Sequence, residues 1–394
     1  MKTLKNYFLF AFLGLAIALS SCKKEDEIQD IEPLTLECNS FEQGNPNAIT
    51  LLKDRGTGVD YIINCIASVE VDLVIEPGVK IAFTNDAGLQ IEDVGSLSAV
   101  ATESSIIEFT GLDKVKGSWN GILFYSNDVK NRMEHCLIDY AGGGTFNSNG
   151  DLGSLLLWAD CYLRLSSVTI SNGAAYGINA DYDNINFAME YCTITTCNFP
   201  FIGDAVLAKN FTAGSYLGNS TNAIVLTNHT TITGVHVWAD LGVPYRIRQE
   251  IYEDLYVENG SLTIEPGVTV EFESGTGIYV GDTDESSLIA VGTEANPILF
   301  TGVTKTPGSW GSISFNFTLY PNNEIAYAIF EYAGADEGAI YMWAEPVVNI
   351  HDVEFRNISS CALYAAPGVS NPNTNLTYSN LTTTNVAGGL ICGE

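Results

Sequence analysis

Basic residues are scarce in this chain. Its 394 residues include 17 lysines and arginines against 47 aspartates and glutamates, a formal net charge of −30 at pH 7. A surface of this charge repels nucleic acid and bare anionic polymers, so we expect no nucleic-acid partner. Neutral glycans, cations or basic protein surfaces are better partners.

Several catalytic signatures are also missing. The sequence has no Gly-x-Ser-x-Gly, Walker-type or dinucleotide-binding motif. Its four histidines have no metal-ligand spacing, and no long segment has helical periodicity. After the first 21 residues, no apolar run is long enough to span a bilayer.

The N-terminus has the pattern of a secretory signal. Lys2 and Lys5 precede an apolar stretch over residues 7–19, which predicts a signal peptide over 1–21. The Leu-Ser-Ser-Cys of residues 19–22 resembles the lipobox of bacterial lipoproteins, which implies that Cys22 carries a lipid anchored in the outer membrane. The Lys-Lys-Glu-Asp-Glu run that follows is similar to the signal that exports some lipoproteins to the outer face of Gram-negative cells; otherwise it is a solvated tether. Residues 22–45 are then expected to be a flexible linker before a folded region over 46–394.

An internal duplication sets the expected architecture, with units at about 60–204 and 245–392. Four motifs recur with small shifts of register, as repeat folds tolerate. They are Ile-Glu-Pro-Gly-Val at 75–79 and 264–268, Gly-Ser-Trp at 117–119 and 308–310, Tyr-Ala-Gly at 140–142 and 332–334, and Leu-Trp-Ala-Asp at 157–160 with Met-Trp-Ala-Glu at 342–345.

Each unit consists of short strand patterns separated by turns. Val79, Ile81 and Phe83 alternate with Lys80 and Ala82, so one side chain in two faces a core. Further strands are expected at 106–109, 121–124, 136–140 and 167–170. These clusters recur at roughly the length of one coil, which favours a single-stranded parallel β-helix over a propeller or a sandwich.

The duplicated motifs also resemble a known family. The run Leu-Thr-Ile-Glu-Pro-Gly-Val-Thr-Val-Glu-Phe at 262–272, the stretch 286–302, Gly-Ser-Trp-Gly-Ser-Ile-Ser-Phe at 308–315 and Phe-Glu-Tyr-Ala-Gly at 330–334 are similar to right-handed β-helix proteins of the pectin-lyase-like superfamily. The likeness covers about residues 60–390. It implies an all-β, right-handed solenoid and specifies no reaction.

Eight cysteines remain besides Cys22, and an even number in an exported protein suggests disulfides. Three of the gaps between sequential neighbours run from 25 to 31 residues, close to one coil, so such bridges could tie adjacent coils. Free buried thiols are the alternative. The candidate pairs are Cys38 with Cys65, Cys136 with Cys161, Cys192 with Cys197, and Cys361 with Cys392.

No catalytic residue can be assigned. A β-helix lyase needs a basic side chain beside Ca²⁺-binding carboxylates, and no arginine here lies in such a motif. A hydrolase needs two or three carboxylates brought together across coils. Two acid-rich loops could offer oxygen ligands to Ca²⁺, or could be merely solvated. Their acids are Asp181, Asp183, Asp282, Asp284 and Glu285.

A Trp-Ala-acid triplet occurs three times, and a planar ring beside a carboxylate can stack on a sugar and accept its hydroxyls. Such tryptophans also form packing ladders in the core of a coil. The contact candidates are Trp158 with Asp160, Trp238 with Asp240, and Trp343 with Glu345. Trp119 and Trp310 of the duplicated Gly-Ser-Trp turn are expected to be structural.

Three functions remain open. We favour a cell-surface lipoprotein whose β-helix binds an extracellular carbohydrate or protein and is not an enzyme. The alternatives are a polysaccharide lyase or glycoside hydrolase, with Ca²⁺ as the only cofactor considered, and a structural surface stalk.

The lipid anchor can be tested directly. Replacing Cys22→Ala removes the thiol that would carry the lipid, so the protein should move from the membrane fraction to the soluble fraction on immunoblots of fractionated cells. Continued anchoring of the variant would show that the lipobox interpretation is wrong.

Overall fold

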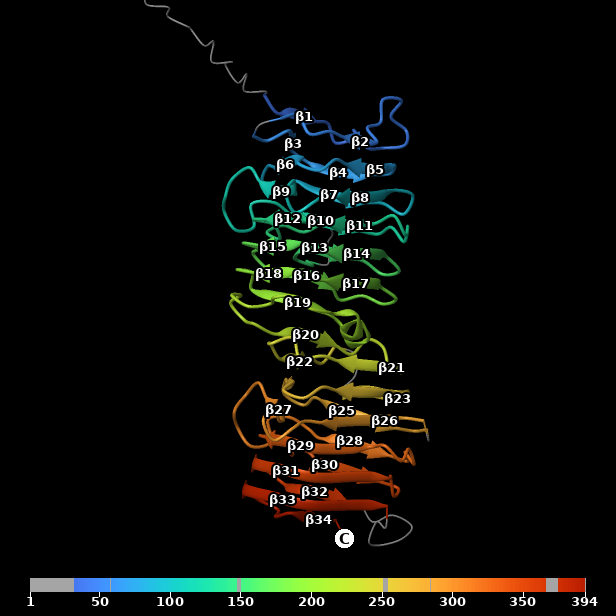
Figure 1. Ribbon diagram of the computed structural model, residues 1–394, viewed down its shortest axis with the longest axis vertical. Coiled ribbons are helices and arrows are strands. Elements are labelled where there is room, and N and C mark those ends of the chain that lie inside the picture. The colour runs from blue at the N-terminus through green and yellow to red at the C-terminus, as the bar shows by residue number, and fades with distance from the viewer. Residues whose placement is uncertain are drawn as a thin grey trace, which may run out of the picture.

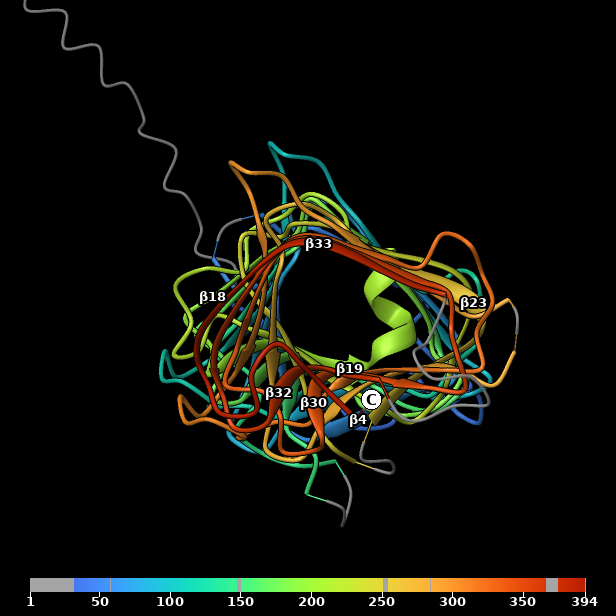
Figure 2. The same cartoon turned by 90° about the horizontal axis from the view of Figure 1, so that it is seen from below.

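The computed structural model describes residues 32–56, 58–146, 150–250, 254–283, 285–365 and 375–393. The predicted signal peptide and Cys22 lie outside these residues. The protein is all-β, with about 50% strand, and its parallel strands form a β-solenoid of about 13 turns. Figure 1 shows these turns stacked along one axis, and Figure 2 shows that they wrap around a common centre. The predicted all-β parallel solenoid is confirmed.

Most turns of the first half contribute one strand to each of three sheets, which we call A, B and C. Sheet A contains β1 (Leu34–Leu36), β3 (Tyr61–Ile63), β6 (Lys80–Phe83), β9 (Ile107–Gly111), β12 (Cys136–Asp139), β15 (Thr169–Ser171) and β18 (Thr193–Thr195). Sheet B contains β2 (Leu51–Leu52), β5 (Asp72–Ile75), β8 (Ser96–Val100), β11 (Arg132–Glu134), β14 (Tyr162–Ser166) and β17 (Asn186–Glu190). Sheet C contains β4 (Ile66–Val69), β7 (Gly88–Ile91), β10 (Gly121–Phe124), β13 (Gly153–Leu157), β16 (Tyr176–Ala180), β19 (Phe199–Asp204) and β20 (Ile224–Thr227).

The second half uses longer strands that pass round a corner from one face to the next. The long strands are β21 (Ile232–Trp238), β23 (Asp254–Ile264), β29 (Glu324–Glu331), β31 (Val348–Ile358) and β33 (Leu376–Val386). The others are β22 (Tyr245–Ile247), β24 (Thr269–Phe272), β25 (Gly277–Gly281), β26 (Ser287–Val291), β27 (Ile298–Gly302), β28 (Ile313–Asn316), β30 (Gly338–Trp343), β32 (Cys361–Ala365) and β34 (Ile391–Cys392). Among the described residues the one helix is the 3₁₀ segment η1 (Ala205–Asn210), and no helix there is long and apolar enough to cross a membrane.

At the junction of the two units, the strand positions shift by one of the three faces of the solenoid. Strand β20 of sheet C pairs with β22, and β22 pairs with β24. By sequence β24 is the counterpart of β6, which belongs to sheet A. Face C of the first unit therefore continues as face A of the second.

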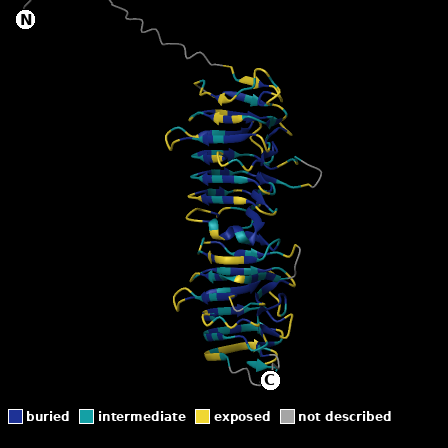
Figure 3. Ribbon diagram, turned by 90° about the vertical axis from the view of Figure 1, so that its right-hand side faces the viewer, coloured by how far each residue is buried: buried dark blue, intermediate teal, exposed yellow. Residues whose placement is uncertain are grey.

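Alternating side chains of the strands fill the interior. In Figure 3 the buried stretches of each coil are dark blue. The duplicated tryptophans lie there fully buried, as expected. Phe83 stacks on Trp119 and Phe272 on Trp310, both with ring centroids 4.0 Å apart and nearly parallel planes. Each indole donates to a backbone carbonyl of the next coil, at 2.9 Å and 2.8 Å. Both copies thus make the same core contact.

The folded region begins earlier than residue 46. Leu34–Leu36 already pairs with Tyr61–Ile63 as the first coil, and Phe41 is fully buried. The prediction of a flexible linker as far as residue 45 is therefore wrong. Because this stretch is polar overall, its two apolar residues Leu36 and Phe41 were not predicted to close the first turn of the core.

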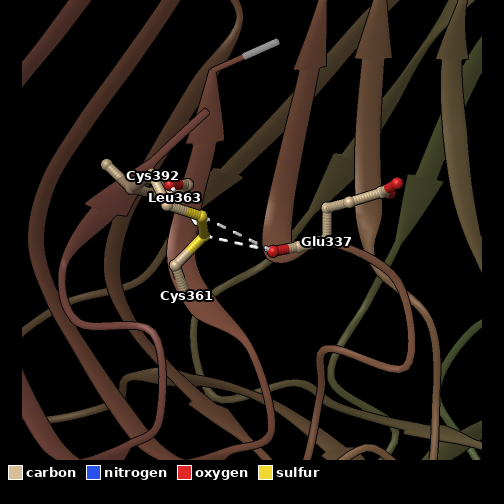
Figure 4. Close-up of a disulfide and its surroundings, with 4 residues drawn as sticks. All are labelled: Glu337, Cys361, Leu363 and Cys392. Carbon is tan, nitrogen blue, oxygen red and sulfur yellow. Dashed lines mark hydrogen bonds between the residues drawn. A yellow bond between two sulfur atoms is a disulfide. The ribbon is translucent and has the colours of Figure 1, made fainter. Parts of the chain in front are cut away.

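Two of the four expected disulfides are present, Cys38–Cys65 and Cys361–Cys392. Figure 4 shows the second, whose sulfurs contact the backbone carbonyl of Glu337 at 3.1 and 3.8 Å. This bridge joins β32 to β34 of the adjacent turn, as the coil spacing suggested.

The other two expected bridges are absent, because all four cysteines are free and buried. Leu137 pairs with Thr169 and Thr169 with Thr193, so the residue next to Cys136 in the stack is Val168, and the one after that is Cys192. Cys161 instead precedes β14 on sheet B. A gap of 25 residues is close to one coil here, but it does not return to the same face. The predicted bridges Cys136–Cys161 and Cys192–Cys197 are wrong.

Cysteine chemistry tests this register. Burial raises the pKa of Cys136 and Cys161 to about 12 and that of Cys192 to about 11. Because the thiolate is the reactive form, an aromatic disulfide reagent should label these cysteines only after denaturation. Peptide mapping of unreduced protein should recover the two bridges and four free thiols. Rapid labelling of the native protein, or a Cys136–Cys161 peptide, would contradict the structure.

Candidate functional site

A row of aromatic rings lies where sheet C turns towards sheet B. Tyr125 follows β10, Trp158 follows β13, and Tyr182 follows β16 by two residues. The ring centroids are 5.3 Å apart between Tyr125 and Trp158, and 4.1 Å apart between Trp158 and Tyr182. The ring planes are tilted by 54° and 31° to each other, and all three side chains are half-buried, so the rings contact one another and still reach solvent.

The row borders a surface cleft of about 490 Å³, which carries two carboxylates. Asp93 and the exposed Asp160 line it together with Tyr125, Asn127 and Trp158. Tyr182 is held in place by donating its hydroxyl proton to Asp151 at 2.5 Å. The combination offers apolar ring faces and hydroxyl acceptors side by side.

The three Trp-Ala-acid triplets are not equivalent. Trp238 is fully buried and stacks on Tyr245 with ring centroids 5.0 Å apart, so its prediction as a contact residue is wrong. It ends β21 with its ring turned inward. The exposed Asp240 accepts a turn hydrogen bond from the backbone N–H of Gly242.

Trp343 is exposed, at 44% of its surface, but no aromatic ring of the described residues stacks on it. Asn316 occupies the paired position on the preceding coil, where the first unit has Tyr125 before Trp158. The backbone carbonyl of Glu345 accepts a hydrogen bond from Asn375. The aromatic row is therefore a feature of the first unit within the described residues.

The row continues along the solenoid as a polar column. Because Ala180 pairs with Gly203 and Asp204 with Thr227, residues just after successive sheet C strands stack on one another. We call this stack the exit column. It contains Tyr125, Trp158, Asp181, Asp204, Thr227 and Arg248.

His229 joins the exit column from the β20–β21 loop. Its Nε2 lies 3.0 Å from Oδ1 of Asp181 and its Nδ1 lies 3.5 Å from Asp183. The Nε2 atom is buried and makes no aligned hydrogen bond. Thr227 donates to the same Asp181 oxygen at 2.6 Å. Acid and imidazole are thus brought together from coils 46 or more residues apart in sequence.

Two carboxyl groups here have shifted acidities. Asp204 is 2% exposed, and burial raises its pKa, although Thr230 at 2.6 Å and the backbone N–H of Val206 stabilise the carboxylate. Partial burial and then the charge of Asp181 raise the pKa of Glu250. Clustered acids with raised pKa values are typical of acid–base chemistry.

The expected calcium ligands do not converge. In the part of the chain that the structure describes, no group of three or more His, Cys, Asp or Glu residues could hold a metal ion. Asp181 is engaged by Thr227 and His229, and Asp282 accepts a hydrogen bond from Tyr279 at 3.0 Å. Asp284 lies outside the described residues. The calcium prediction gains no support from these loops.

Sequence analysis missed several residues of this site. They are Tyr125, Tyr182, Asp204, His229 and Glu250. His229 was set aside for lacking metal spacing, and Asp204 follows an ordinary strand. The sequence carried one signal for these residues, the recurrence of a polar residue after each sheet C strand. This recurrence can be recognised only when the register between the coils is known.

No family model matches this chain, and no curated protein or solved structure matches it. Any function proposed for this site therefore depends on the geometry of the site alone.

The buried Asp204 predicts a specific pH dependence. Since its folded pKa is raised, the folded state binds a proton more readily than the unfolded chain, and stability should fall as pH rises through the range just above the ordinary aspartate pKa. Asp204→Asn should flatten this dependence in urea unfolding midpoints measured across that range. The exposed Asp160→Asn makes the same charge change and should leave the profile as it is. If the urea midpoints of Asp204→Asn vary with pH as those of the wild type do, the raised pKa of Asp204 is contradicted.

Proposed function

We propose that the protein binds extracellular carbohydrate through the aromatic row and its cleft. What supports this is the row of Tyr125, Trp158 and Tyr182, three partly exposed rings in contact, the first two of which line a cleft with Asp93 and Asp160. Ring faces of this kind pack on the apolar face of a sugar, while carboxylates accept its hydroxyl hydrogens. The strong negative charge favours a neutral glycan over a polyanion at this cleft.

We place this module on the cell surface. The lipobox-like residues 19–22 and the charged run after Cys22 support an outer-membrane lipoprotein that faces the exterior. The duplicated motifs together with the parallel solenoid support membership of the pectin-lyase-like superfamily. A purely structural stalk fits less well, because it gives no reason for a partly exposed aromatic row beside a cleft.

A second candidate function is glycoside hydrolysis in the exit column. The observation that favours it is the single cluster of Asp181, Asp204, His229 and Glu250 at the junction of the two units, on the same edge as the aromatic row. Hydrolysis needs one carboxyl group as acid and a second carboxylate as base or nucleophile. Asp204, whose pKa is raised by burial, suits the role of the acid, and Asp181 stands next to it in the exit column as the second carboxyl group.

Binding is tested on a glycan panel with the purified full chain. Trp158→Ala removes the central ring of the row and should weaken binding of a recognised glycan by roughly 5- to 150-fold, since stacking on a ring contributes on the order of 1–3 kcal/mol. Trp343→Ala is the matched control, because this exposed tryptophan has no stacked neighbour among the described residues, and its affinity should equal that of the wild type. Equal affinities for all three proteins would contradict the role of the row.

The same samples decide between binding and hydrolysis. Analysis of each bound glycan for new reducing ends should find none if the protein only binds. Fragments that disappear in Asp204→Asn while binding persists would establish the hydrolase instead.

A further inference from the structure

The described residues leave the interior of the solenoid uncovered at its C-terminal end, where Figure 1 shows β33 in the last turn. β33 lies in register on β31, so the interior-facing positions of the two strands stack on each other. On β31 these side chains are at most 2% exposed, whereas on β33 they are half-buried or exposed. Apolar side chains of β33 therefore reach solvent. The stacked pairs are Val348 with Leu376, Ile350 with Tyr378, Val353 with Leu381, Phe355 with Thr383, and Ile358 with Val386.

The N-terminal end of the solenoid is closed by comparison. The turns that follow β1 bury Phe41 completely, and Leu36 of β1 is 3% exposed. The backbone N–H of Ile49 donates to the carbonyl of Ser40 at 2.8 Å, which holds these turns together. The first coil thus already has the cover that the last described coil lacks.

The outer edge of β33 has none of the usual protection against pairing. Within the described residues this strand of 11 residues has a ladder partner on one edge only, β31. Exposed strand edges are commonly blocked by proline or by charged side chains, and β33 contains neither. Threonine, tyrosine and valine, which favour strands, make up about half of it. Its free N–H and C=O groups can therefore accept another strand.

Charge decides which partner fits this end. Each copy of the chain has a formal net charge of −30, so two copies repel each other wherever their carboxylates meet. Residues 357–393 contain no aspartate, glutamate, lysine or arginine, although these make up 16% of the chain. Charges more than about 8 Å apart are largely screened at physiological ionic strength, so the charge at the contact itself matters most. Two C-terminal ends can therefore meet without opposing carboxylates, whereas Glu32 and Glu37 are exposed at the N-terminal end.

The C-terminal edge is also held firmly in place. The disulfide Cys361–Cys392 links β34 to β32 on the preceding coil, where the two strands also pair in register (Figure 4). A surface that is ordered beforehand loses little conformational entropy when it binds.

We propose that two copies of this chain associate through their C-terminal coils, with β33 of one copy antiparallel to β33 of the other. The uncovered side chains of Leu376, Tyr378 and Leu381 then cover those of the second copy, and the two free edges gain backbone hydrogen bonds. A two-fold axis relates the copies, so the contact closes at a dimer. The contact is independent of the carbohydrate site proposed above, which lies in the first unit.

The test is sedimentation velocity of the purified full chain over a concentration series at low and high salt. The wild type should form a dimer of twice its 42.5 kDa mass, and the dimer should persist at high salt because the contact is uncharged. Thr383→Asp puts a short carboxylate at an interior-facing position of the contact and should weaken dimerisation at least about tenfold. Thr35→Asp makes the same change at an exposed position of β1, the edge strand of the other end, and should dimerise as the wild type does.

Hydrogen exchange at low and high protein concentration locates the contact. Exchange should slow with concentration in residues 376–386 and stay unchanged in residues 34–36. Because Thr383 is exposed in the single chain, Thr383→Asp should keep the circular dichroism spectrum of the wild type. The proposal is overturned by a wild type that stays monomeric, by equal dimerisation of Thr383→Asp, by loss of dimerisation in Thr35→Asp, or by slowed exchange elsewhere only.

Discussion

The structure depends on backbone hydrogen bonds between successive coils. A coil of a parallel solenoid has no partner within itself, so its N–H and C=O groups are satisfied by the coils before and after it. This constraint fixes the spacing and the register, and it stacks each side chain on the one at the same position of the next coil. Phe330 meets Phe300 on one side and Phe355 on the other for this reason.

Register explains why the duplication repeats the core but not the site. The Phe–Trp stacks recur with nearly identical geometry because both units need a filled interior. At the junction, face C of the first unit becomes face A of the second. Asp181, Asp204 and Thr227 therefore stack in a column that continues from the aromatic row of the first unit. This cluster of polar side chains lies where the repeat is interrupted.

The sequence by itself determined the all-β solenoid, the strands at 121–124 and 136–140, and the structural role of Trp119 and Trp310, because alternation, turn residues and duplication are local signals. Only the tertiary structure decided that Trp238 is buried, that Cys136 faces Val168 instead of Cys161, and that His229 meets Asp181. These neighbours depend on how many residues each turn contains and on which face each segment occupies. Turn lengths in this chain vary, so contacts between coils follow from the register and not from sequence spacing.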